Sequence, residues 1–129
     1  MVMYPFDYIQ GKPFVKVKFN EDVFDIQCLV DSGADYSVFP AVIGKEIGID
    51  FHDYDLLKEN VSGLTGDVKC KKWRVSLPIY INDITESITI EAIFVNSKKI
   101  ENILGRKTFF NKFKEVIFDE ENKKVIFKK

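Results

Sequence analysis

The chain has few of the residues on which most hydrolases and metalloproteins depend. Its 129 residues include one histidine, His52, and two cysteines, Cys28 and Cys70. A single histidine argues against a Ser-His or Cys-His triad, and neither a Gly-x-Ser-x-Gly elbow nor a P-loop occurs. His52 stands near Asp53 and Asp55 without a dependable ligand spacing, so no metal and no cofactor is expected.

Long apolar runs and an excess of one charge are missing as well. No stretch of about 18 apolar residues is present, and Met1 to Gln10 lacks the basic start and apolar run of a signal peptide. The formal net charge of −1 gives no reason to expect a nucleic acid or a membrane as partner. The two distant cysteines are typical of reduced thiols, so a cytoplasmic protein is expected.

What the chain does have is a high content of apolar and aromatic residues in short runs. Apolar residues make up 46% of the sequence, with 12 Phe among them. The length predicts a single domain over residues 1–129, with a core at about 12–127 and an N-terminal arm at 1–11. This aromatic-rich arm is expected to form an added strand or a contact arm of a dimer.

Apolar and polar residues alternate with a period of two through most of the chain, which is typical of half-buried strands. Strands are predicted at 12–19, 23–30, 37–39, 72–81, 84–95, 115–118 and 124–127. Pro40 suits the first turn of a helix that runs to about Ile47, with Gly48 just past its end. A second short helix is predicted at 106–113. The fold class is therefore mostly β with one or two short helices.

One loop concentrates chemically useful residues at the end of an apolar strand. The run 23–30 leads directly into Asp31-Ser32-Gly33-Ala34-Asp35. A carboxylate in this position is costly to bury unless it is hydrogen-bonded or shared. Gly33 lets the chain turn sharply, and the small Ala34 keeps a close backbone approach open. Far downstream, Asn102-Ile103-Leu104-Gly105-Arg106 forms a second apolar segment that ends in glycine and arginine.

These two segments together resemble the signatures of the retropepsin-like aspartic proteases. That family has an apolar pair followed by Asp-Thr/Ser-Gly-Ala, here Leu29-Val30-Asp31-Ser32-Gly33-Ala34, and later an apolar-apolar-Gly-Arg element, here Ile103 to Arg106. The resemblance covers residues 12–127. It implies a closed β-barrel of the acid-protease type with one lobe per chain. Because each chain carries one Asp-Ser-Gly, it also implies a homodimer that cleaves a peptide or protein substrate.

The resemblance assigns roles to individual residues. Asp31 would be the catalytic acid and base, Ser32 would link the two loops across the dimer axis, and Gly33 would offer its carbonyl to the substrate. Ala34, Asp35 and Ile103 would contact the substrate. Gly105 and Arg106 would support the loop, with Arg106 pairing near Asp35 through a bidentate contact.

A predicted hairpin completes the implied site. Two glycines three residues apart between extended arms predict a hairpin tip. The resemblance makes this hairpin a flap that closes over the substrate. Its residues are Val61, Ser62, Gly63, Leu64, Thr65 and Gly66.

Three interpretations of the Asp31 loop remain open at this point. The first is an aspartic endopeptidase that activates water between the two Asp31 carboxylates of a homodimer. The second is a catalytically silent dimer of the same fold that binds peptides or acts as a scaffold. The third is a β-rich structural domain in which Asp31 merely forms an Asx-turn after a strand.

Overall fold

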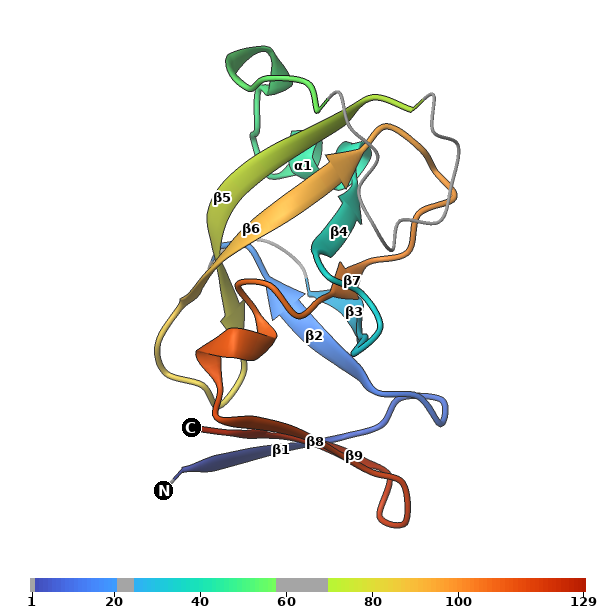
Figure 1. Cartoon of the computed structure of the whole chain (residues 1–129), viewed down its shortest axis with the longest axis vertical. Helices are drawn as coiled ribbons and strands as arrows, with labels where there is room; N and C mark the ends of the chain where they lie inside the picture. The colour runs from blue at the N-terminus through green and yellow to red at the C-terminus, as the bar shows by residue number, and fades with distance from the viewer. Residues whose placement is uncertain (1, 21–24, 58–69) are drawn as a thin grey trace.

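The computed structural model describes residues 2–20, 25–57 and 70–129, and it consists mainly of β-structure. Figure 1 shows a barrel with a small sheet beneath it. In order around the closed barrel, the strands are β2 (Phe14–Lys18), β3 (Ile26–Val30), β7 (Ile103–Leu104), β4 (Ser37–Pro40), β6 (Ile88–Val95) and β5 (Lys72–Ile81). The predicted mostly β fold with a closed barrel is confirmed.

The small sheet, called the terminal sheet below, is built from the two ends of the chain. Its order is β1 (Met3–Asp7), β9 (Lys124–Lys128) and β8 (Glu115–Asp119). The strand β1 pairs antiparallel with β9 from Met3↔Lys128 to Asp7↔Lys124. The N-terminal arm is therefore an added strand that pairs within its own chain.

Alternation along the strands produces the core. In β2 and β3 every second side chain is buried, as in Val15, Val17, Ile26 and Cys28. The same apolar cluster continues downward through Phe127 of β9 into the terminal sheet. Barrel and terminal sheet thus share one hydrophobic core, which fixes the sheet against the underside of the barrel.

The strands β4 and β6 are buried more completely than alternation predicts. All four residues of β4 and the last four of β6 are buried. A second apolar cluster explains this, because Val38, Ile93 and Val95 pack together on the other side of these strands. Tyr36 and Ile103 lie half-buried against that cluster.

The predicted short helix after Pro40 is present as α1 (Ala41–Glu46). Pro40 itself is extended, with φ −62° and ψ 141°, and serves as the last residue of β4 and the N-cap of α1. Gly48 follows the helix with φ +94°, a left-handed conformation that glycine adopts readily. A 3₁₀ turn, η1 (Phe51–Asp53), leads on toward β5.

Two predicted elements are shorter than expected. The segment 106–113 is a turn followed by a 3₁₀ helix, η2 (Phe110–Lys112), because Thr108 has φ +66° and interrupts any regular helix. The strand predicted from residue 84 begins at Ile88, since Asp83 has φ +70° and the amide of Ile84 closes a turn onto the carbonyl of Ile81. Residues 23 and 24 of the strand predicted at 23–30 lie outside the described residues. Within the described parts of the chain, no helix is long and apolar enough to cross a membrane.

Gly105 lies where two chain segments approach each other most closely. It follows β7 directly and is buried. A Cβ atom added there would overlap the carbonyl oxygen of Tyr36 and lie 2.9 Å from the carbonyl oxygen of Ala34. Both obstacles are backbone atoms, which cannot rotate away, so only glycine fits.

Replacing Gly105 by alanine is expected to lower the free energy of unfolding by roughly 3 kcal/mol or more, because the backbone itself must shift. Thermal or urea unfolding measures this loss. Gly11→Ala is the matched control: Gly11 has φ +74° but nothing within 4 Å of its added Cβ, so only the strain of about 1–2 kcal/mol is expected. Equal losses in the two variants would contradict the role given to Gly105.

Candidate active site

The Asp31 loop is positioned by the parallel pairing of β3 and β7. Leu29 faces Ile103 and Val30 faces Leu104 in the register of these strands. Parallel strands end at the same edge of a sheet, so Asp31 and Gly105, which follow them, emerge side by side. The amide of Asp31 donates to the carbonyl of Leu104 at 3.0 Å. The Asp31 loop and the segment from Ile103 to Arg106 are thus joined directly through the backbone.

The Asp31 carboxylate is fixed by its own loop. Its Oδ1 accepts a hydrogen bond from the amide of Gly33 at 2.8 Å, and its carbonyl accepts one from the amide of Ala34 at 3.3 Å. Asp31 is half-buried, whereas Ser32 and Gly33 are exposed and Ala34 is buried. The carboxylate is therefore held in one orientation while the tip of its loop faces outward.

The backbone of the segment after Gly105 is hydrogen-bonded to the last residues of the Asp31 loop. The amide of Arg106 donates to the carbonyl of Ala34 at 2.9 Å, and the amide of Lys107 donates to the carbonyl of Asp35 at 2.7 Å. These two bonds run backbone to backbone and depend on no side chain. These two bonds fix the position of Asp35 relative to Gly105, as expected if the segment after Gly105 supports the loop.

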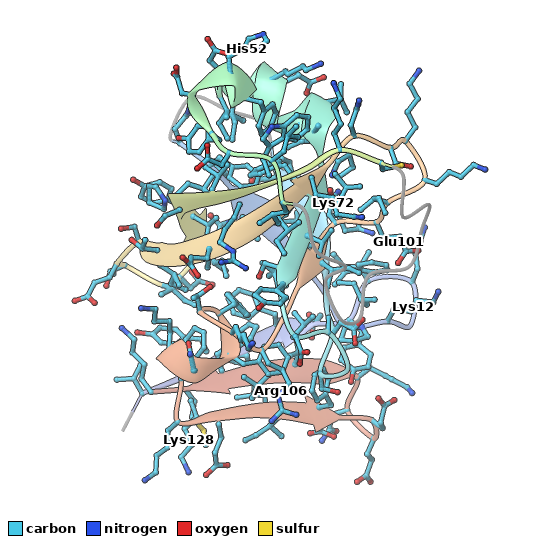
Figure 2. The ribbon with its side chains drawn as sticks, turned by 45° about the horizontal axis from the view of Figure 1, so that its top comes forward. Lys12, His52, Lys72, Glu101, Arg106 and Lys128 are labelled. Carbon is cyan, nitrogen blue, oxygen red and sulfur yellow. The ribbon has the colours of Figure 1, made fainter. Side chains whose placement is uncertain are left out.

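The side chain of Arg106 takes a different direction from the one expected. Among the described residues, no ion pair joins Arg106 to Asp35. Arg106 is exposed, and Figure 2 shows it low on the molecule, beside the terminal sheet. Within one chain it is the Arg106 backbone that supports the loop.

Arg106 contributes to a cleft of about 380 Å³ between the Asp31 loop and β8. We call this the Ser32 cleft, because Ser32 lines it next to Asp31. Its apolar lining comes from Phe110, Phe113, Val116 and Phe118. The loop that carries Asp31 is therefore continuous with a hollow surface lined by both apolar and polar side chains.

The structure describes Ile103 but not the predicted flap. Ile103 is half-buried against Val38 and Ile93, so it belongs to the second apolar cluster beside the Asp31 loop. Residues Val61, Ser62, Gly63, Leu64, Thr65 and Gly66 lie outside the described residues. Their assignment as a flap stays a prediction.

Two polar residues that the sequence did not single out anchor the site. Ser37 is fully buried, and its hydroxyl accepts a hydrogen bond from the amide of Gly105 at 3.1 Å. Asn102 accepts the amide of Leu29 on its carbonyl at 2.8 Å and donates from its side chain to the carbonyl of Gln27 at 3.3 Å. The signals available in the sequence were a serine directly before the apolar residues of a predicted strand and a polar residue directly before an apolar segment.

Neither Cys28 nor His52 is part of the arrangement around Asp31. The Cys28 side chain is fully buried in β3, where desolvation raises the pKa of its thiol and disfavours the reactive thiolate. His52 lies at the end of the molecule opposite Arg106 (Figure 2). Within residues 2–20, 25–57 and 70–129, no three His, Cys, Asp or Glu side chains are grouped to hold a metal ion.

Replacing Ser37 by alanine is expected to cost about 1–3 kcal/mol of unfolding free energy, because the buried amide of Gly105 loses its acceptor. Chemical denaturation measures the loss. Ser97→Ala is the control: the Ser97 hydroxyl also accepts a backbone amide, that of Lys99, but on the surface. There a change within about 0.5 kcal/mol is expected. A Ser37 variant as stable as the Ser97 variant would remove Ser37 from the frame of the site.

Comparison with solved structures identifies the fold. A retropepsin-like aspartic protease from Rickettsia conorii superimposes with a TM-score of 0.71 at 16% identity, over 98% of this chain and 99% of that one. The retroviral protease-like domain of Ddi1 from Leishmania major superimposes with a TM-score of 0.57 at 16% identity, over 88% of this chain and 91% of that one. No protein-family model and no curated sequence matches.

These similarities extend over nearly the whole chain, while the sequence identity is low. What the chain shares with both structures is the overall fold. The chain therefore has the fold of the retropepsin-like aspartic proteases.

Proposed function

We propose that this protein is an aspartic endopeptidase that works as a homodimer and activates water between two Asp31 carboxylates. The observation that carries the proposal is the geometry of the loop. Asp31 stands half-buried at the end of β3, its carboxylate oriented by the Gly33 amide, in a barrel of the retropepsin-like fold. The bond from the Gly33 amide is that of an Asx-turn, so it is the place of this carboxylate in the retropepsin-like fold that supports a catalytic role.

One carboxylate per chain is not enough for this chemistry. Two carboxylates at short distance cannot both ionise cheaply, so such a pair holds one proton between them. The ionised member takes a proton from water as the water oxygen attacks the peptide carbonyl carbon. The protonated member gives its proton to the carbonyl oxygen, which leaves a tetrahedral intermediate with two hydroxyl groups. The carboxyl that took the proton of water then gives it to the peptide nitrogen, while the other carboxylate removes a proton from one of these hydroxyls. The C–N bond breaks, and a carboxylic acid and an amine are released. The pair titrates as a unit.

The other residues of the loop bind and orient the substrate in this proposal. Exposed Gly33 offers its carbonyl to an extended peptide, while Ala34 and Asp35 border the path of the peptide main chain. Ile103 supplies an apolar wall for a substrate side chain. Ser32 faces the partner, and residues 61–66 act as the flap that excludes water.

The substrate would be an unfolded or extended segment of a protein, bound through main-chain hydrogen bonds in the groove between the two copies. Neither a nucleic acid nor a membrane is part of the proposal. A cytoplasmic site of action fits the two free cysteines, one of which is buried in β3.

The direct test replaces Asp31 by asparagine, which keeps the shape of the side chain and its hydrogen bond from Gly33 but cannot accept the proton of water. Cleavage of denatured casein or of a peptide library is expected to fall by roughly 10²- to 10⁴-fold. The assay is run from acidic to neutral pH. Asp53→Asn, an exposed aspartate of η1, is the matched control and should leave the rate unchanged.

Cleavage that survives in the Asp31 variant would overturn the enzyme assignment. Peptide binding by the natural chain without cleavage at any pH would instead favour the second interpretation, a silent peptide-binding module. Both outcomes are read from the same library, with binding followed by fluorescence anisotropy.

A further inference from the structure

One face of the barrel sheet, pointing away from the main core, carries a row of side chains that runs from apolar to cationic. The strands β7, β4, β6 and β5 are neighbours in that order (Figure 1). Their registers align Ile103 with Val38, Val38 with Ile93, and Ile93 with Arg74. Residues that face each other in neighbouring strands point to the same side of a sheet, so these four side chains form one row. We call the surface that carries this row the Arg74 face.

Tyr36 attracts two cations on this face. Its ring packs against the apolar cluster of the row. The Arg74 guanidinium carbon is 5.6 Å from the centre of the Tyr36 ring, and the Lys107 ammonium nitrogen is 4.7 Å from it. Lys107 Nζ also donates a hydrogen bond to the Tyr36 hydroxyl at 3.2 Å. Both cations are within the range in which an aromatic ring attracts positive charge, so these contacts gather the three polar groups.

The three groups gathered here are hydrogen-bond donors without a matching acceptor. Guanidinium and ammonium groups accept no hydrogen bond, and a phenol that accepts one from Lys107 still has its own O–H to donate. Among the described residues, neither Arg74 nor Lys107 forms an ion pair, not even with the nearby acids Asp35 and Glu91. In the same part of the chain, the Tyr36 hydroxyl accepts a bond but donates none. A carboxylate only accepts hydrogen bonds, so it complements this set.

Lys72 extends the positive charge along β5. It faces Val95 and stands two residues before Arg74, so its side chain is on the same side of the sheet. Lys72 is only 7% exposed, and it has no ion-pair partner within residues 2–20, 25–57 and 70–129. Burying an ammonium group without a counter-ion is unfavourable, so an anion bound on the Arg74 face would stabilise it.

The Arg74 face borders the path proposed for the substrate. Tyr36 directly follows Asp35, whose carbonyl accepts the amide of Lys107 at 2.7 Å. Tyr36 and Ile103 also pack against the same apolar cluster. A peptide that runs along Asp35 and Ile103 therefore brings one of its side chains to the Tyr36 hydroxyl.

We infer that the Arg74 face is a subsite for an acidic side chain, so that the peptides bound and cleaved carry glutamate or aspartate near the bond that is cut. This inference rests on the proposed function and names the chemistry of its substrate. The substrate carboxylate accepts hydrogen bonds from the Arg74 guanidinium and the Tyr36 O–H. Lys107 and Lys72 add positive charge, which favours an acidic side chain and opposes a basic one.

The test compares peptides that differ in one side chain. A peptide library with Glu, Gln or Lys at each position near the cleaved bond is assayed at about pH 6, above the ordinary glutamate pKa of about 4.3. At one position, kcat/KM should be roughly tenfold higher for Glu than for Gln, as a charge-assisted hydrogen bond provides, and lowest for Lys. Added salt should reduce this preference.

Substitutions remove the donors one at a time. In Arg74→Gln the ratio of kcat/KM for Glu over Gln peptides should fall from roughly tenfold to about one, and in Tyr36→Phe by roughly threefold. Arg74→Glu should reverse the order and favour Lys peptides. Lys16→Gln is the matched control, because it removes one positive charge from an exposed residue of β2, and it should keep the preference of the natural chain. Circular dichroism confirms that each variant is folded.

Binding separates the subsite from the proposed reaction. Fluorescence anisotropy with the Asp31→Asn variant measures the affinity for labelled Glu and Gln peptides without cleavage. Tighter binding of Glu peptides that disappears when Arg74→Gln is added would support the subsite even if the natural chain cleaves nothing, and it would refute only the protease. Equal affinities and rates for Glu and Gln peptides, no binding of any Glu peptide, or a preference that survives in Arg74→Gln would overturn the acidic subsite.

Discussion

The parallel pairing of β3 with β7 is the constraint on which the rest of the site depends. It joins segments that are far apart in the chain, Leu29 with Ile103 and Val30 with Leu104. Since parallel strands end at one edge, the acidic loop after β3 and the Gly-Arg segment after β7 must leave the barrel together. The bond from the Asp31 amide to the Leu104 carbonyl follows directly from that register.

Glycine and serine make this junction possible. The chain after β7 passes against the backbone of Ala34 and Tyr36 with no room for a Cβ at Gly105. The buried amide of Gly105 then needs an acceptor inside the protein, and the hydroxyl of Ser37 provides it. A larger residue at position 105 would therefore prevent the close approach of the two segments. An apolar residue at position 37 would leave the Gly105 amide without its acceptor.

Local sequence predicted the features that depend on local chemistry. Alternation predicted most of the strands, and Pro40 and Gly48 predicted the ends of α1. The fold was predicted from the resemblance of the two motifs to a known family. Features that depend on contacts between distant segments were less accessible. The helix predicted at 106–113 is interrupted at Thr108, whose hydroxyl accepts the amide of Glu91 on a neighbouring strand. The packing of β4 and β6 on both faces likewise depends on Tyr36 and Ile103.

The Asp31 loop is held mainly by backbone hydrogen bonds of its own chain, so its shape depends on no other molecule. Within one chain, the loop is held by amides and carbonyls of residues 31–35 and 104–107 together with the Gly33 bond to Asp31. None of these bonds uses the side chains of Ser32 or Arg106, which instead line the cleft beside β8. Folding of one chain therefore fixes the orientation of Asp31. In the proposed homodimer, association would only have to bring two such loops together, which costs less conformational entropy than assembling a flexible site.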